Sequence, residues 1–233
     1  MLSACGGSGS SDAVAADALP IDVAADDALK PNERLQGTIE LDIGKGATVY
    51  RSIATKLADN LGEVAAQQLD SAEGRRTLDD ANARLKGDVK VQSSDVQALA
   101  DHFAGKTIYT SELRDIDMIK RRNVTIRGIS AGGATAALVL SFTMADNRLE
   151  SAVLEYTPDN RKLTQSFTTD EAHPAEVSIE RFEQIEDSTW RIAGSFKADK
   201  MVPNVLAKKL AGQTVDGASG RFDITELRAK PKL

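Results

Sequence analysis

The sequence has one cysteine, few aromatic residues and no long apolar run. Because Cys5 is the only cysteine, the chain forms no internal disulfide. Aromatic residues make up 4% of the 233 residues, which is little material for a base-stacking platform or a sugar-binding cleft. No stretch reaches the roughly 18 consecutive apolar residues of a transmembrane helix. Membrane attachment must therefore be peripheral or through a lipid.

A basic face is also lacking. The net charge is −6, and residues 1–35 hold six acidic residues against two basic ones, so the rest of the chain is closer to neutral. The densest basic cluster, Lys120-Arg121-Arg122, has Asp115 and Asp117 beside it and is typical of a solvated strand end. Because nucleic-acid binding needs a basic surface, we expect no nucleic-acid partner.

The clearest motif lies in the first ten residues. Leu2-Ser3-Ala4-Cys5 resembles the lipobox of bacterial lipoproteins, in which small residues precede the cysteine that becomes acylated. The Gly/Ser run after Cys5 is typical of a flexible tether. The resemblance implies a signal peptide from an upstream start codon, a palmitate-bearing anchor on Cys5 and a place in the bacterial cell envelope. Gly6 after the cysteine favours the outer membrane by the same resemblance.

Apolar spacing predicts one strand and then three helices in the first half of the chain. Residues 6–34 hold too little apolar mass to fold alone, so we expect a linker. Residues 35–43 alternate apolar and polar side chains, as a half-buried strand does. Helical spacing follows in three segments: from Ile53 to Leu69, over 71–85, and over 94–103 with Ser94 as N-cap and Gly105 past the end.

Strict alternation in the second half predicts antiparallel strands. It is clearest in residues 138–144 and 149–156, which the turn signal Asp146-Asn147 joins into a hairpin. Further strands are expected at 107–109, 124–127, 177–182, 189–196 and 220–225, with a short helix over 203–210.

These segments predict an α+β fold behind the tether of residues 1–34. The single domain is expected to span 35–233, with a mainly helical part at 35–105 and an antiparallel part of about six strands at 106–233. The sheet is expected to close as a sandwich or a partial barrel, and the strand at 35–43 can join it.

Two glycine-led motifs share one form, Ala193-Gly194-Ser195-Phe196 and Ser219-Gly220-Arg221-Phe222. They resemble closing strands of small bacterial lipoprotein β-domains. Glycine within a strand lets a neighbouring aromatic ring or backbone approach closely, so we interpret both motifs as architectural.

One motif suggests catalysis. Gly128-Ile129-Ser130-Ala131-Gly132-Gly133 matches the G-x-S-x-G nucleophile elbow and resembles hormone-sensitive-lipase-like esterases of the α/β-hydrolase fold. That resemblance implies Ser130 as nucleophile and His173 as base. The orienting acid would be Asp146, Asp159 or Asp170.

The context of this motif argues against a hydrolase. Residues 138–144 alternate like a strand where the elbow requires a helix. Only 43 residues separate Ser130 from His173, and the strand–helix units of a parallel sheet are missing. We therefore expect a protein that is not an enzyme, with a periplasmic serine hydrolase as the alternative.

The sequence offers no metal or cofactor motif. His102 and His173 lack the spacing of a zinc site, and the Asp pairs at 26–27 and 79–80 lack that of a calcium loop. The leading hypothesis is a lipid-anchored envelope protein with a non-catalytic binding or structural role toward another envelope protein. A protective lipoprotein, such as an immunity protein for a toxin, is a further alternative.

Overall fold

A computed structural model describes residues 29–84, 90–130, 137–146, 148–158 and 165–230. Its fold is α+β, with an eleven-stranded, mostly antiparallel sheet and three α-helices. The strands are β1 (Glu33–Asp42), β2 (Ala47–Lys56), β3 (Thr107–Tyr109), β4 (Glu112–Ile116), β5 (Arg121–Ser130), β6 (Ala137–Ala145), β7 (Arg148–Thr157), β8 (Phe167–Thr168), β9 (Glu176–Glu186), β10 (Thr189–Pro203) and β11 (Val215–Ala229). The sheet has more strands than the sequence predicted, because β4 and β8 are too short to show a period and β2 overlaps a segment for which a helix was predicted.

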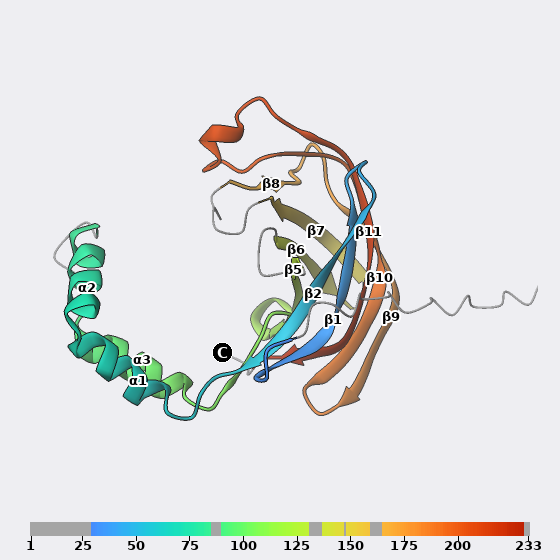
Figure 1. Cartoon of the computed structure of the whole chain (residues 1–233). Coiled ribbons are helices and arrows are strands. Elements are labelled where there is room, and N and C mark those ends of the chain that lie inside the picture. Colours follow the sequence, from blue (N-terminus) through green and yellow to red (C-terminus); the bar gives the residue numbers. More distant parts are fainter. Residues whose placement is uncertain (1–28, 85–89, 131–136, 147, 159–164, 231–233) are drawn as a thin grey trace, which may run out of the picture.

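The strand pairings run around a closed circuit. Each strand pairs with the next in the order β1, β2, β5, β6, β7, β8, β10 and β11, and β11 pairs back with β1. The pair of β11 with β4 is parallel and covers two residues. Figure 1 shows the sheet curving around an interior, which holds one apolar core.

The hairpin of β6 and β7 supplies one wall of this core. In β6, Leu138, Leu140, Phe142 and Met144 are buried, whereas the residues between them are half-exposed. The register runs from Ala137 opposite Thr157 to Ala145 opposite Arg148. The hairpin predicted from the alternation is therefore confirmed.

The two Gly-x-Phe motifs face each other in β10 and β11. Gly194 lies opposite Phe222, and Phe196 lies opposite Gly220. A Cβ on Gly194 would come 2.9 Å from Phe222 Cζ, and one on Gly220 would come 2.6 Å from Phe196 Cζ. Each glycine thus leaves room for the ring on the other strand, as the close-approach interpretation predicts.

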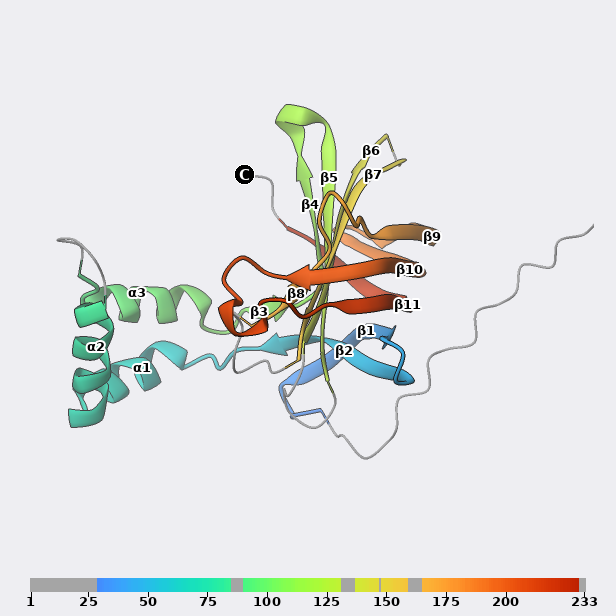
Figure 2. The same cartoon turned by 90° about the horizontal axis from the view of Figure 1, so that it is seen from above.

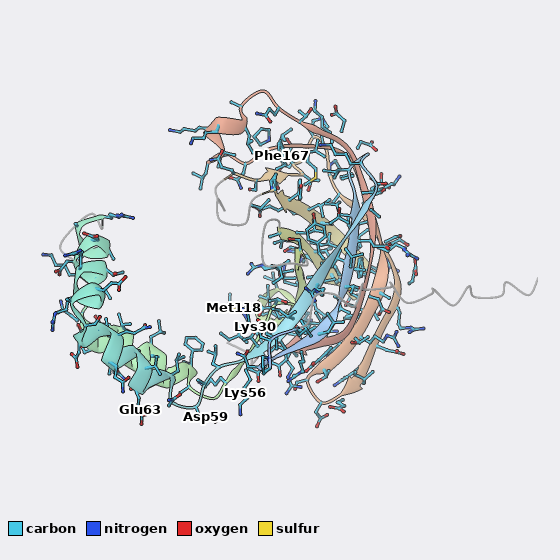
Figure 3. The ribbon with its side chains drawn as sticks, in the orientation of Figure 1. Lys30, Lys56, Asp59, Glu63, Met118 and Phe167 are labelled. Carbon is cyan, nitrogen blue, oxygen red and sulfur yellow. The ribbon has the colours of Figure 1, made fainter. Side chains whose placement is uncertain are left out.

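The helices form an arm between β2 and β3. This helical arm comprises α1 (Leu61–Asp70), α2 (Ala72–Arg84) and α3 (Ser93–Phe103), and it projects away from the sheet (Figures 1 and 2). Lys56 and Asp59 lie where the arm leaves the sheet, with their charged groups 3.8 Å apart, and Glu63 lies on α1 (Figure 3). α1 contacts both other helices. The helices thus follow two strands rather than one.

Two helix predictions were wrong in their bounds, and a third was wrong in its N-cap. Ile53 lies buried in β2, and α1 begins only at Leu61, because β2 pairs on both sides and its β-branched residues suit a sheet. α3 begins after Gln92, whose N–H donates to Asp95 Oδ2 at 2.8 Å in a capping box, so Ser94 is not the N-cap. Over 203–210, β10 continues through Pro203 and only Lys208–Leu210 forms a 3-10 turn.

Candidate functional site

Among the described residues, the structure brings together His173 and Asp170 of those suggested for catalysis. Cys5 and Asp159 lie outside the described residues, and Asp146 occupies the turn after β6. His173 Nδ1 lies 3.0 Å from Asp170 Oδ1, and the hydrogen bonds from His173 lower the pKa of Asp170. Ser130 ends β5, and the segment holding His173 follows β8.

The strand order separates these groups. β6 and β7 lie between β5 and β8, which places the two strands about 14 Å apart along the sheet at roughly 4.8 Å per strand. The segment after Ser130 leads into strand β6 rather than into a helix. The helix that supports an oxyanion hole in a hydrolase elbow is therefore replaced by a strand at residues 137–145.

A larger feature lies where the helical arm joins the sheet. A cleft of about 1160 Å³ opens there between the end of α3, β3, β4, β5, the turn after β9 and the end of β11. Three other hollows in the described part of the chain have volumes of about 500, 370 and 200 Å³. This arm-base cleft is lined by Phe103, Lys106, Thr107, Ile108, Tyr109, Thr110, Glu112, Thr125, Arg127, Ser188, Arg228, Ala229 and Lys230.

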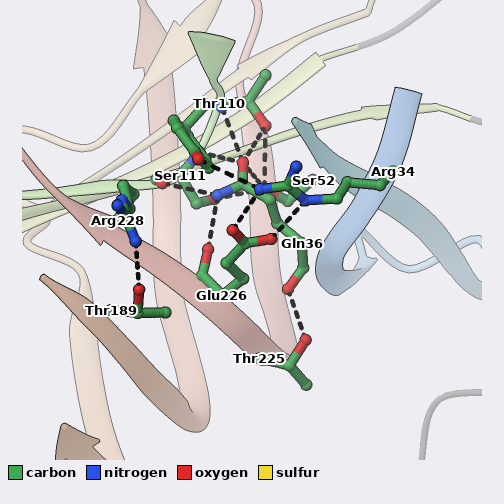
Figure 4. A network of polar contacts seen from close by, with 10 residues as sticks. Arg34, Gln36, Ser52, Thr110, Ser111, Thr189, Thr225, Glu226 and Arg228 are labelled. Atoms are coloured by element: carbon green, nitrogen blue, oxygen red, sulfur yellow. Dashed lines mark hydrogen bonds and ion pairs between the residues drawn. The ribbon is translucent and has the colours of Figure 1, made fainter. Parts of the chain in front are cut away.

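Two guanidinium groups lie close to the ring of Tyr109 in the cleft. The Cζ atoms of Arg34 and Arg228 lie 5.5 and 5.8 Å from the centre of its ring, within the range of cation–π attraction. Arg34 also donates to Tyr109 Oη at 3.2 Å and, through two nitrogens, to the Glu226 carboxylate (Figure 4). The hydrogen bond to Glu226 raises the pKa of Arg34, so this guanidinium remains charged.

A buried amide fixes the backbone beneath Tyr109. Gln36 is fully buried, and a bulge between Leu35 and Gly37 displaces it from regular pairing. Its Nε2 donates to Ser111 O at 3.0 Å and to Glu226 O at 2.6 Å, and its Oε1 accepts from the N–H groups of Thr110 at 2.9 Å and Ser111 at 3.0 Å (Figure 4). One side chain therefore joins β1, the start of β4 and β11.

The cleft carries positive charge that nearby carboxylates do not neutralise. Glu112 is paired with Lys230 at 2.5 Å. Within the described ranges, Lys106, Arg127 and Arg228 have no carboxylate oxygen within 4.0 Å. The Nη1 atom of Arg228 donates to the hydroxyl of Thr189 at 2.5 Å, which aims the guanidinium without cancelling its charge.

Apolar surface adjoins these cations. Ile108 is 45% exposed, and Phe103 and Tyr109 are half-buried. Lys106 Nζ lies 6.0 Å from the centre of the Phe103 ring and 3.2 Å from a ring nitrogen of His102. The cleft can therefore bind an anionic group and an apolar group side by side.

Sequence reasoning missed this cleft. Its three unneutralised cations come from separate elements, α3–β3, β5 and β11, so no basic cluster appears in the chain. The densest cluster, at 120–122, contains two arginines that are neutralised by acids: Arg121 by Glu150 and Arg122 by Asp115. The densest basic cluster in the sequence therefore does not mark the cleft.

The chain matches no family model, no curated protein and no solved structure. In the part of the chain that the structure describes, no three His, Cys, Asp or Glu residues are grouped so as to hold a metal ion. None of the described helices combines the length and apolar character needed to cross a membrane.

Proposed function

We propose that the protein is anchored by a lipid on Cys5 in a bacterial cell envelope, where it binds another envelope protein without catalysing a reaction. The observation that carries the binding role is the arm-base cleft, in which three cations without carboxylate partners among the described residues line the same cleft as apolar side chains. Arginine forms paired, directional hydrogen bonds with carboxylates. The cleft therefore suits a protein segment that places an acidic side chain beside an apolar one.

The role of the cleft can be tested by photo-crosslinking in cells that produce the lipidated, full-length protein. Benzoylphenylalanine replaces either Ile108 in the cleft or Ile185 on β9, which are 45% and 51% exposed. We expect a covalent adduct with an envelope protein from position 108 and none from position 185. Because the two positions are similarly exposed, a difference in adduct yield reports where the partner binds rather than how accessible each position is.

Charge reversal tests whether the cations recruit the partner. Arg127→Glu should reduce the adduct at position 108 at least tenfold, because it places a carboxylate where an acidic segment would bind. Lys45→Glu, at an exposed position in the turn after β1, should leave the adduct unchanged. Equal adducts from positions 108 and 185, or an adduct that survives Arg127→Glu, would rule out the cleft as the binding site.

The lipid anchor has a separate test. The protein is produced behind a bacterial lipoprotein signal peptide and labelled with a palmitate analogue. We expect label on the protein and recovery in the membrane fraction, and we expect Cys5→Ala to lose both because the thiol is the acylated group. A Cys5→Ala variant that remains equally labelled and membrane-bound would show that this cysteine is not the anchor.

A further inference from the structure

The end of the β10–β11 hairpin projects beyond its neighbours. β9 pairs with β10 only from Thr189 to Lys197, and β1 pairs with β11 only from Gly37 to Asp42. Beyond those points, β8 is the one strand of the described residues that pairs with the hairpin, at Val202 and Pro203. Figure 1 shows the connecting segment in red at the top of the molecule, on the side of the sheet from which the helical arm also projects.

The segment Asn204–Leu210, the hairpin tip, is an ordered turn. The Asn204 N–H donates to Ser166 O at 2.8 Å, and Asn204 accepts from the N–H groups of Leu206 at 3.1 Å and Ala207 at 2.7 Å. Ala207 is buried, and Leu210 packs against the core. The tip is therefore fixed to the sheet from below.

This ordered turn holds two large apolar side chains in solvent. Val205 is 92% exposed and Leu206 is 64% exposed, although Ala207 beside them is buried. Burying such side chains away from water is favourable. Their exposure to water therefore lowers the stability of the free domain. Contact with an apolar medium removes this loss.

The tip is also positively charged in an acidic protein. Residues 200–215 contain Lys200, Lys208 and Lys209 and no acidic residue, whereas the whole chain has a net charge of −6. Over the described ranges, neither Lys208 nor Lys209 has a carboxylate oxygen within 4.0 Å. Apolar side chains beside lysines are the composition of segments that enter the headgroup region of anionic bilayers.

We propose that the hairpin tip is a membrane-contact site, with Val205 and Leu206 entering the headgroup boundary of an anionic lipid surface and Lys208 and Lys209 contacting its phosphates. This contact is distinct from the arm-base cleft and needs no acyl chain on Cys5. It orients the domain on the membrane, with the β10–β11 hairpin end toward the lipid.

A second exposed turn shows why the charge matters. Met118, between β4 and β5, is 95% exposed, and Ile119 beside it is 50% exposed. The basic residues beside that turn, Lys120, Arg121 and Arg122, are matched in number by Asp115, Asp117 and Glu150, so the turn carries no excess positive charge to attract it to an anionic surface. The turn therefore provides a matched control.

The test uses the unlipidated full chain and sedimentation with vesicles of phosphatidylcholine containing about one-third phosphatidylglycerol. We expect binding to these vesicles and at least tenfold weaker binding to phosphatidylcholine alone. Val205→Ser/Leu206→Ser and Lys208→Glu/Lys209→Glu should each lower the partition coefficient at least tenfold. Met118→Ser should lower it less than twofold. Thermal unfolding followed by the fluorescence of Trp190 checks that each variant is folded.

Three outcomes would overturn the proposal. They are no binding to the anionic vesicles, equal loss from Met118→Ser and from the tip variants, and binding that does not depend on phosphatidylglycerol. Any of these would leave a protein partner as the occupant of the tip. Because crosslinking at Ile108 and vesicle binding are separate measurements, the failure of one does not decide the other.

Discussion

Gln36 takes the place of strand-to-strand hydrogen bonds at one point in the sheet. Its amide satisfies two backbone N–H groups and two backbone carbonyls around residues 110, 111 and 226. Buried backbone groups without partners cost about 1–3 kcal/mol each. The geometry of the arm-base cleft therefore depends on a residue that does not line it.

Gln36→Leu should lower the free energy of unfolding by about 2–4 kcal/mol, because it leaves these backbone groups buried and unpaired. Urea unfolding followed by Trp190 fluorescence measures the change. Gln67→Leu, at an exposed position on α1, is the control and should change stability by less than about 0.5 kcal/mol. Similar losses from both substitutions would contradict the role given to the Gln36 amide.

At the scale of single residues, the sequence could not predict the cleft. The bulge after Leu35 determines that the Gln36 side chain is buried in the sheet. The alternation of apolar and polar residues in the sequence does not show where a bulge lies. Arg34 and Arg228 meet Tyr109 from strands far apart in the chain, so no local spacing relates them. The close approach at Gly194 and Gly220 could be predicted, because a strand glycine weakens the strand unless a ring or a backbone packs into the space it leaves.

Among the elements, the β6–β7 hairpin is the one whose inward and outward faces the sequence defines best. Phe142 is 1% exposed and lies 6.5 Å from Phe222 between ring centres, whereas Thr143 is half-exposed on the other face. Adjacent positions therefore differ sharply in environment while sharing the same strand.

Phe142→Asp should unfold the domain or lower its stability by at least about 4 kcal/mol, because an unpaired charge would enter the core. Thr143→Asp should cost less than about 1 kcal/mol, because its side chain reaches solvent. Thermal unfolding by circular dichroism compares the two variants under the same conditions. Equal effects would mean that the inward face of β6 is assigned to the wrong residues.

Other elements show where periodicity misleads. Ile53 and Leu57 have the spacing of a helix, yet pairing with β1, β3 and β5 makes 47–56 a strand. Residues 203–210 resemble a helix with proline in its first turn, but cross-strand bonds carry β10 through Pro203. α2 and α3 were placed nearly correctly because their pattern is long and no sheet competes for it.

In the molecule as a whole, the sequence indicated the α+β class and antiparallel pairing but not the closed circuit. Closure requires β11 to pair with both β1 and β10, and β2 to pair with β5 although the helical arm separates them in the sequence. These contacts join segments far apart in the chain, and alternation within a strand says nothing about its neighbour. The closed shape is thus a property of pairing partners rather than of local composition.

The position of β11 between β1 and β10 also sets an order of events in folding. Gln36 finds its partner Glu226 only 190 residues later, so β1 cannot complete its pairing until the last strand has been synthesised. The contacts of α1 with α2 and α3 lie within residues 61–103, so the helical arm can form long before the last strand is made. Because loop closure must come before such distant contacts form, folding of this domain should take milliseconds to seconds. A newly made chain exposes the edge of β1 until its final strand arrives.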